Sequence, residues 1–209
     1  PPAITAIAAG PDNSTYVAGT FAGTLNVVPT LIEPEVGQTL HSTPATDGDP
    51  THAQDVFIVR YDGGGSLVFA RVFSNVVNGT ETATALVVDR FGSAYLAGAS
   101  TAIDPTARVT ERAYITKFDG FAGHQMWTRP IPRAASTAAI DHHDNLWLAQ
   151  GGAKLDLSVY NGRGKFRQTL PVATPTDWLQ RAGVITARSI AFDRADNIVL
   201  SGAATRVFD

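Results

Sequence analysis

Short apolar runs separated by turn residues recur along the chain, and four stretches share one fifteen-residue pattern. Each copy has a small apolar run, a polar turn, a second apolar or aromatic run and a closing glycine. That order predicts a β-hairpin, and its recurrence predicts a repeat architecture. The copies read TAIAAGPDNSTYVAG from Thr5, TALVVDRFGSAYLAG from Thr84, TAAIDHHDNLWLAQG from Thr137 and RSIAFDRADNIVLSG from Arg188.

A second pattern follows the first three hairpins. An alternating run ends in an aromatic residue plus Asp or Asn, passes a glycine-rich turn and returns as another run. The three copies are DVFIVRYDGGGSLVFARVF from Asp55, RAYITKFDGFAGHQMWTRPI from Arg112 and KLDLSVYNGRGKFRQTLPV from Lys154. Two hairpins per period predict a four-stranded antiparallel meander, whose strands we name A, B, C and D. A period of about 40–50 residues with four strands is typical of a β-propeller blade.

The fold class expected is therefore all-β, a β-propeller in a single domain over residues 1–209. Blade one covers about residues 4–74 with an insertion at 27–54, blade two 83–131, blade three 136–172, and a partial blade four 188–209. The final ATRVFD, from Ala204, aligns with strand C, which gives about three and three-quarter blades. Such a set cannot close a ring of four or more blades. We expect a piece of a larger propeller, or open blade edges that a partner or a second copy completes.

The hairpin turns and the strand register are also predicted. Asp89, Asp141 and Asp193 begin the A–B turns, where a carboxylate accepts local backbone amides, and Gly, Asp or Asn follow where φ is near or above zero. Val17, Leu96, Leu148 and Leu200 occupy one column of strand B. We expect equivalent inward environments for them, because a one-residue slip would turn every apolar side chain outward.

Composition narrows the function classes. Apolar residues make up 44% and charged residues 17%, which is typical of a folded chain. The net charge is −3 without a basic stripe, so no nucleic-acid partner is expected. The chain has no cysteine, which excludes disulfides, thiolate zinc sites and a Cys nucleophile. No apolar run reaches the ~20 residues of a membrane span.

These repeats resemble the bacterial seven-bladed β-propeller repeats. The likeness is strongest from VAGTFAGTLNV through DVFIVRYDGGGSLVFARVFS, and it implies an exported repeat protein. RVFD also resembles the C strand of NHL propellers, and FDGFAGHQMWTRP resembles the tryptophan-docking turn of quinoprotein propellers. Trp127 is the only Trp at its place, where the other copies carry Phe69 and Phe166. The resemblance therefore implies a fold more than an activity.

Candidate binding residues lie in the long connections. The insertions Val27–Gln54, Ser100–Glu111 and Ala173–Ala187 all join B to C or D to A, so they share one face of the disc. We expect binding there, through His41, Asp47, Asp49, His52, Asp177, Trp178 and Arg181. Carboxylates of the first insertion could hold calcium, and a solvated loop is the alternative. No other cofactor is expected. The proline-rich first insertion is expected to be the least ordered or most partner-dependent region.

Two further features favour structure over chemistry. His142 and His143 suggest a metal site, but they lie in a tight A–B turn where neighbouring side chains are expected to diverge. No G-x-S-x-G elbow is present, so no catalytic residue is assigned.

The function expected is that of a non-enzymatic binding or assembly module, in the extracellular space or cell envelope of a bacterium. Its partner would be a protein or the rest of a longer parent chain. One alternative is a propeller enzyme, either a lyase, a hydrolase or a degenerate quinoprotein, with its site at the central channel. Another is a structural subunit completed by neighbouring chains.

Overall fold

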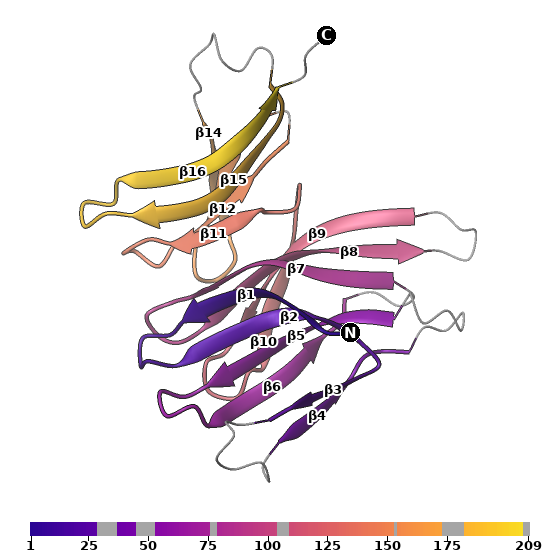
Figure 1. The fold of residues 1–209 in the computed structure, drawn as a ribbon. Coiled ribbons are helices and arrows are strands. Elements are labelled where there is room, and N and C mark those ends of the chain that lie inside the picture. The colour runs from indigo at the N-terminus through magenta and orange to yellow at the C-terminus, as the bar shows by residue number, and fades with distance from the viewer. Residues whose placement is uncertain are drawn as a thin grey trace. The chain divides into compact units, whose positions relative to one another are not determined.

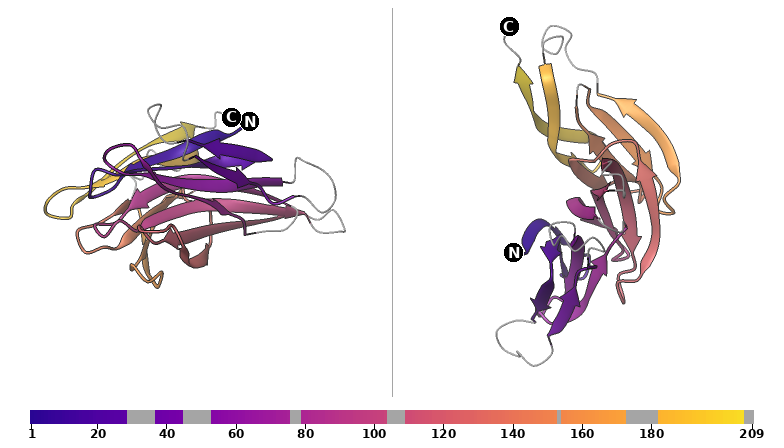
Figure 2. Two further views of the ribbon diagram at one scale, coloured as in Figure 1. Left: turned by 90° about the horizontal axis from the view of Figure 1, so that it is seen from below. Right: turned by 90° about the vertical axis from the view of Figure 1, so that its right-hand side faces the viewer.

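The computed structural model describes residues 1–28, 37–44, 53–75, 79–103, 109–152, 154–172 and 182–206, and within these ranges every regular element is a β-strand. The chain divides into two compact units, residues 1–132 and 133–209 (Figure 1). The strands of both units are twisted, as Figure 2 shows. The boundary falls between the second and third repeats. The single domain expected from the sequence stays a prediction.

The first unit holds two four-stranded antiparallel meanders. Repeat one consists of β1 (Ala3–Ala9), β2 (Thr15–Ala22), β5 (Ala53–Tyr61) and β6 (Leu67–Phe73). Repeat two consists of β7 (Gly79–Val88), β8 (Ala94–Ile103), β9 (Val109–Phe118) and β10 (Gln125–Ile131). Only two residue pairs join β5 to β7, in parallel. The two meanders therefore act as separate sheets that share a corner.

The second unit holds a third meander and a hairpin. Repeat three consists of β11 (Thr137–Ile140), β12 (Leu146–Gln150), β13 (Asp156–Tyr160) and β14 (Phe166–Pro171). Repeat four contains β15 (Ala182–Phe192) and β16 (Ile198–Arg206). The predicted four-stranded meanders are confirmed in the first three repeats.

The prediction that the chain ends in a fourth strand C is wrong for the described residues of that segment. Ala204, Thr205 and Arg206 continue strand B as the end of β16 and pair with β15. The long antiparallel register of this hairpin satisfies the backbone groups of these residues, so they do not start a new strand. Residues 207–209 lie outside the described part of the chain.

The turn chemistry predicted from the sequence is confirmed. Oδ1 of Asp89, Asp141 and Asp193 each accepts hydrogen bonds from the amides two and four residues later. One turn position has positive φ in all four repeats, and its occupants are Asn13 (60°), Gly92 (81°), Asp144 (60°) and Asp196 (59°). These are the residue types that tolerate a left-handed backbone, so local sequence fixes each hairpin.

The strand-B column has the predicted register but not one common environment. The four residues pair with strand A in the same way, as Ile7–Val17, Leu86–Leu96, Ala138–Leu148 and Ile190–Leu200. Leu96 and Leu148 are fully buried, whereas Val17 and Leu200 are half-buried. The expectation of equal burial is therefore wrong, because the sheet faces that carry this column are covered to different extents.

Repeats one and two pack face to face. Tyr16, Ala18, Val56, Ile58, Phe69 and Phe73 of repeat one form one apolar cluster with Ala83, Leu86, Ala94, Leu96, Tyr114 and Phe118 of repeat two. The Tyr16 hydroxyl donates a hydrogen bond to the Gly92 carbonyl, 2.6 Å away in the next repeat. Arg60 also joins the repeats, since it donates to the Gly120 carbonyl and to Asp12. The Tyr16 hydroxyl and the two terminal guanidinium nitrogens of Arg60 therefore keep partners when the faces close, whereas the buried Arg60 Nε has none among the described residues.

The opposite face of repeat one is covered by a hairpin from the first insertion. This hairpin, β3 (Thr24–Val27) and β4 (Gln38–His41), was missed in the sequence. Its Val27 and Leu40 are buried in a cluster with Phe21, Phe57 and Val59. β4 lies beside β6, and β3 contacts β2 (Figure 1). The rest of the insertion, residues 29–36 and 45–52, lies outside the described residues, so the expectation about its order stays a prediction.

Gly19 and Gly98 both lie on strand B. Because they have no side chain, a carbonyl of strand A and an aromatic ring of strand C can lie close to them. A Cβ on Gly98 would lie 2.0 Å from the Thr82 carbonyl oxygen and 2.5 Å from the Tyr114 hydroxyl. A Cβ on Gly19 would meet the Ala3 carbonyl at 2.1 Å and the Phe57 ring at 2.7 Å. Backbone oxygens and packed rings cannot yield by such amounts, so both positions exclude a side chain.

We predict that Gly98→Ala destabilises the protein by about 2 kcal/mol or more, because the methyl group must push β7 or the Tyr114 ring aside. Gly64→Ala is the control, since its nearest atom would be Asp62 Oδ1 at 3.3 Å. It should stay within about 0.5 kcal/mol of the parent. Denaturant unfolding measures both, and equal stability of the two variants would contradict the packing described.

Candidate functional site

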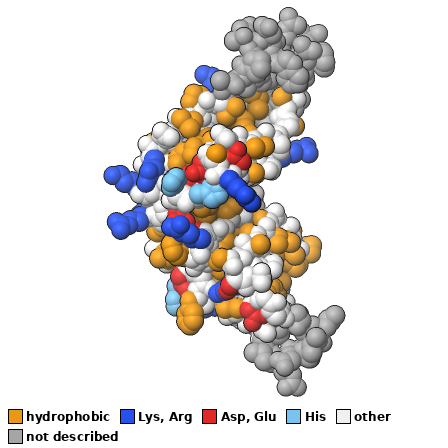
Figure 3. Space-filling view, turned by 90° about the vertical axis from the view of Figure 1, so that its left-hand side faces the viewer, with side chains coloured by type: hydrophobic (Ala, Val, Ile, Leu, Met, Phe, Trp, Pro, Cys, Tyr) orange, Lys and Arg blue, Asp and Glu red, His pale blue; other side chains and the backbone are white. Residues whose placement is uncertain are grey.

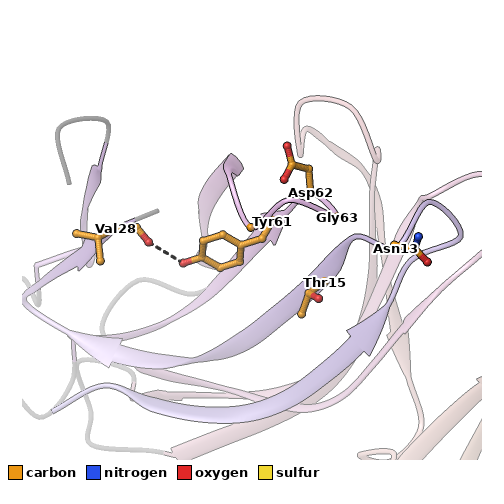
Figure 4. Close-up of a pocket in the computed structure, with 7 residues that line it drawn as sticks. Asn13, Thr15, Val28, Tyr61, Asp62 and Gly63 are labelled. Carbon is orange, nitrogen blue, oxygen red and sulfur yellow. Dashed lines mark hydrogen bonds between the residues drawn. The ribbon is translucent and has the colours of Figure 1, made fainter. Parts of the chain in front are cut away.

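An open pocket of about 420 Å³ lies at the turn end of repeat one. Three segments build it: the A–B turn with the start of β2, the residue after β3, and the end of β5 with its following turn. Its lining consists of Asn13, Thr15, Val28, Tyr61, Asp62, Gly63 and Gly65 (Figure 4). Figure 3, which views the molecule from the side of the β1–β2 and β5–β6 turns, shows charged, histidine and hydrophobic side chains interspersed on that surface. The pocket is open to solvent, since Asn13, Thr15 and Asp62 of its lining are exposed.

The pocket occupies a position that is core in other repeats. Thr15 pairs with Tyr61 across β2 and β5. The same strand pair is Ala94–Phe118 in repeat two and Leu146–Tyr160 in repeat three, and all four of those residues are buried. Thr15 is exposed and Tyr61 half-buried. Repeat one therefore presents hydroxyl groups where its sister repeats present packed side chains.

The Tyr61 ring is held in place at the pocket wall. Its hydroxyl donates a hydrogen bond to the Val28 carbonyl at 3.1 Å, and the ring packs on the cluster beneath the β3–β4 hairpin. Figure 4 shows the ring between Val28 and Thr15. Burial raises the pKa of the Tyr61 phenol above its ordinary value, so the hydroxyl remains a donor at neutral pH.

Asp62 contributes a carboxylate that is only partly used by the fold. Oδ1 accepts hydrogen bonds from the amides of Gly64 and Ser66, at 2.9 and 2.8 Å. Among the described residues, Oδ2 receives none. The glycine-rich turn after Asp62 also brings bare backbone to the pocket rim. This arrangement can accept hydrogen bonds from a ligand without disturbing the turn.

A second cluster joins the A–B turns of repeats three and four. His142 Nδ1 lies 2.6 Å from Asp196 Oδ1, and His143 Nε2 lies 3.3 Å from Asp196 Oδ2. The expectation that the two imidazoles diverge is therefore wrong, because both lie against the Asp196 carboxylate of the next repeat. Within the described residues, no group of three or more His, Asp or Glu is placed to hold a metal ion. The cluster links two turns.

The turn aspartates also anchor aromatic residues of strand B. Asp141 Oδ2 accepts hydrogen bonds from Trp147 Nε1 at 2.9 Å and from the Asn145 amide at 2.8 Å. Burial alone would raise the pKa of the Asp141 carboxyl. The hydrogen bonds from Trp147 and Asn145 outweigh that effect and lower its pKa below the ordinary value. The buried carboxylate is thus held in its charged form.

The corresponding group in repeat two is a buried triad. Lys117 Nζ lies 3.1 Å from Asp89 Oδ2 and donates to the Tyr95 hydroxyl at 2.7 Å, and Tyr95 donates to Asp89 at 3.2 Å. The three side chains are almost fully buried. The three side chains are hydrogen-bonded to one another and are shielded from solvent. They therefore stabilise the turn and are not accessible to a substrate.

The residues predicted to bind lie mostly outside the described part of the chain. His41 is exposed on β4, where its Nδ1 lies 3.5 Å from Thr24 Oγ1. Asp47, Asp49, His52, Asp177, Trp178 and Arg181 belong to the segments that the structure does not describe. Their predicted role, and the calcium site, stay predictions. In the part of the chain described, no helix is long and apolar enough to cross a membrane.

Sequence reasoning missed the repeat-one pocket, although a signal was present. Alignment of the four hairpins puts Thr15 beside Ala94, Leu146 and Ile198. A hydroxyl at one place in an otherwise apolar column marks the repeat whose face is not fully packed. The contribution of Val28 had no such signal, because it depends on the return of β3 across the sheet.

No protein-family model and no curated protein matches the chain. Among solved structures, a protein of unknown function from Bacteroides caccae aligns with 8% identity and a TM-score of 0.47, covering 95% of this chain and 53% of that chain. A gluconolactonase from Xanthomonas campestris aligns with 15% identity and a TM-score of 0.32, covering 95% of this chain and 82% of that chain. This chain thus spans about half the length of the first structure. At such scores neither likeness carries an argument about function.

We predict that Asp141→Asn loses about 1–2 kcal/mol of stability at pH 7, because the charged acceptor of Trp147 and Asn145 is gone. The folded pKa of Asp141 lies below the unfolded value, so its contribution is present above about pH 4 and lost as the pH falls through the folded pKa. The variant should therefore approach the parent in stability near pH 2. Denaturant unfolding at several pH values measures this, and an equal loss at pH 7 and pH 2 would contradict it.

Proposed function

We propose that the repeats are β-propeller blades and that the chain works as a non-enzymatic binding module of an exported or cell-surface bacterial protein. The four-stranded meanders, their face-to-face packing and the resemblance to exported propeller repeats support this proposal. The binding site is the repeat-one pocket. The sequence also predicts binding at the face that carries the long B–C and D–A connections. That binding remains a separate proposal, because nearly all of its candidate residues lie outside the described ranges.

One observation carries the binding proposal: a strand pair that is core elsewhere lines a pocket in repeat one. A purely structural repeat gains stability from apolar residues at these positions, as Ala94 and Phe118 illustrate. Thr15 and Tyr61 instead carry hydroxyl groups, and Asp62, which lines the same pocket, has an Oδ2 that accepts no hydrogen bond from the described residues. A few polar groups beside a fixed aromatic ring are typical of small-molecule sites.

We predict that Thr15→Arg blocks this pocket, because a long cationic side chain then lies against Asp62. The assay is saturation-transfer NMR with small polar molecules that carry positive, negative or no charge. Molecules that bind the parent should lose about tenfold or more in affinity for the variant.

Thr82→Arg, at an exposed strand position of repeat two, is the matched control and should bind like the parent. The proposal would be overturned if no molecule of the set bound the parent. It would also fail if the bound molecules remained on Thr15→Arg with unchanged affinity.

Assembly is a second candidate function, favoured by an exposed sheet face of repeat four. Val199 is 60% exposed, although it occupies the strand-B position of Tyr16 and Trp147. Tyr16 is buried against the following repeat, and Trp147 packs with Phe192 of repeat four. Ser201 and Ala203, on the same face of β16, are also exposed. A two-fold pair of copies is the smallest assembly that covers this face.

Under this second candidate, we expect the chain to self-associate at concentrations of about 0.01–1 mM. Val199→Lys should weaken association about tenfold or more, because it places a charge in the apolar contact. Phe121→Lys is the control, since Phe121 is 89% exposed on a turn outside this face. Analytical ultracentrifugation measures all three proteins. A parent that stays monomeric, or equal effects of the two substitutions, would rule out assembly through β16.

A further inference from the structure

The repeat-one pocket has the chemistry of a site for a neutral ligand rich in hydroxyl groups. Four of its side chains are polar: the Tyr61 phenol, whose hydroxyl already donates to the Val28 carbonyl, and one amide, one aliphatic hydroxyl and one carboxylate, from Asn13, Thr15 and Asp62. An amide and a hydroxyl both donate and accept hydrogen bonds, while the carboxylate only accepts. No hydrogen bond within the described residues uses the side chains of Asn13 or Thr15. A ligand that presents several adjacent hydroxyls can satisfy all three groups at once.

The charge around the pocket disfavours anionic ligands. Asp62 is the one charged residue among those that line it. Arg60, the neighbour of Tyr61 on β5, lies on the opposite face of the sheet, where Asp12 and the Gly120 carbonyl engage its guanidinium. A phosphate or carboxylate ligand would thus meet a like charge without a cation to offset it.

The aromatic wall adds a flat apolar surface. The ring of Tyr61 is fixed at both ends, by the sheet at Cβ and by the Val28 carbonyl at the hydroxyl. A fixed ring contributes contact area at little entropic cost, and Val28, 56% exposed, extends the apolar side of the pocket. The C–H face of a sugar ring is complementary to such a wall, while its hydroxyls reach the rim.

The form of the pocket agrees with this ligand class. Its 420 Å³ lies near the lower end of the range of about 300–1,000 Å³ for small-molecule sites. The pocket is open, so a larger chain can extend out of it. The β3–β4 hairpin covers the adjoining part of the same sheet face, where Phe57 and Val59 are buried.

We propose that this pocket binds a carbohydrate, as a single neutral sugar ring or the end of a glycan. The proposal rests on the binding function proposed above and names its ligand class. Tyr61 stacks on the ring, Asp62 Oδ2 accepts from two sugar hydroxyls, and Thr15 and Asn13 exchange hydrogen bonds with their neighbours.

The test is an NMR titration of the isotopically labelled 209-residue chain with methyl β-glucoside, methyl β-galactoside, methyl α-mannoside and cellobiose. Glucuronate and choline serve as the anionic and cationic comparisons. We expect at least one neutral sugar to shift the amide signals of Asn13, Thr15 and Gly63 and to saturate at about 0.1–10 mM.

Two conservative variants keep the fold and remove one contact each. Asp62→Asn preserves the turn, because Asn161 accepts the same amides in repeat three. Thr15→Ala introduces the residue that repeat two has at this place. Each should weaken sugar binding about 5- to 30-fold. Asp119→Asn, the same change in the equivalent turn of repeat two, should leave binding within about twofold of the parent.

Each outcome decides the proposal. Sugar binding that falls in both pocket variants and not in Asp119→Asn supports it. Binding of choline in preference to every sugar, or sugar binding that the pocket variants leave unchanged, overturns it. If no sugar binds while other small molecules are lost from Thr15→Arg, the carbohydrate assignment fails and the binding function stands.

Discussion

The structure depends on covering an apolar face of each four-stranded sheet. A twisted sheet of this size is not stable alone, so one apolar face must pack on a neighbour. In the first unit, that contact is the cluster in which Tyr16 and Ile58 of repeat one meet Leu96 and Phe118 of repeat two. Two hydrogen bonds cross the junction, since Tyr16 donates to the Gly92 carbonyl and Arg60 donates to the Gly120 carbonyl. Stacking therefore sets both the spacing of the repeats and the alignment of their turns.

The other face of repeat one is covered by a hairpin of the same repeat and not by a neighbouring repeat. The first insertion returns as β3 and β4 and buries Val27 and Leu40 against that face. The hairpin is tied at its base by the Gly23 amide, which donates to Ser42 Oγ at 2.7 Å. Gln38 extends the attachment, because its Oε1 accepts from the Ala70 amide at 3.2 Å. The hairpin leaves Thr15 exposed and Tyr61 half-buried, and the pocket that these two residues line is the proposed site.

Local sequence was enough to predict the hairpins and meanders. Asp89, Asp141 and Asp193 act within a few residues of themselves, so their turns can be inferred from the chain alone. The β3–β4 hairpin could not be inferred, because its short strands lack sustained alternation and are stabilised by the sheet they cover. The contacts of Asp196 with His142 and His143 join different repeats, and only the packed structure brings them together.

The site was predictable only in part. Thr15 departs from an apolar column that is visible in the sequence, whereas Val28 reaches the pocket through a chain reversal that no pattern marks. The ending of β16 was misread because ATRVFD resembles the aromatic-Asp end of strand C, while its described residues pair in register with β15. Similarity to the other repeats thus gave a wrong prediction here, because these residues extend strand B by hydrogen bonding to β15 and do not form strand C.

The β3–β4 hairpin closes the face of repeat one that is opposite to repeat two and leaves the pocket beside it. Nuclear Overhauser contacts in a methyl-labelled sample test this most directly. The account predicts cross-peaks from the methyl groups of Val27 and Leu40 to the rings of Phe21 and Phe57, which share one buried cluster. Absence of these cross-peaks, with those between Leu96 and Phe118 present, would contradict the account.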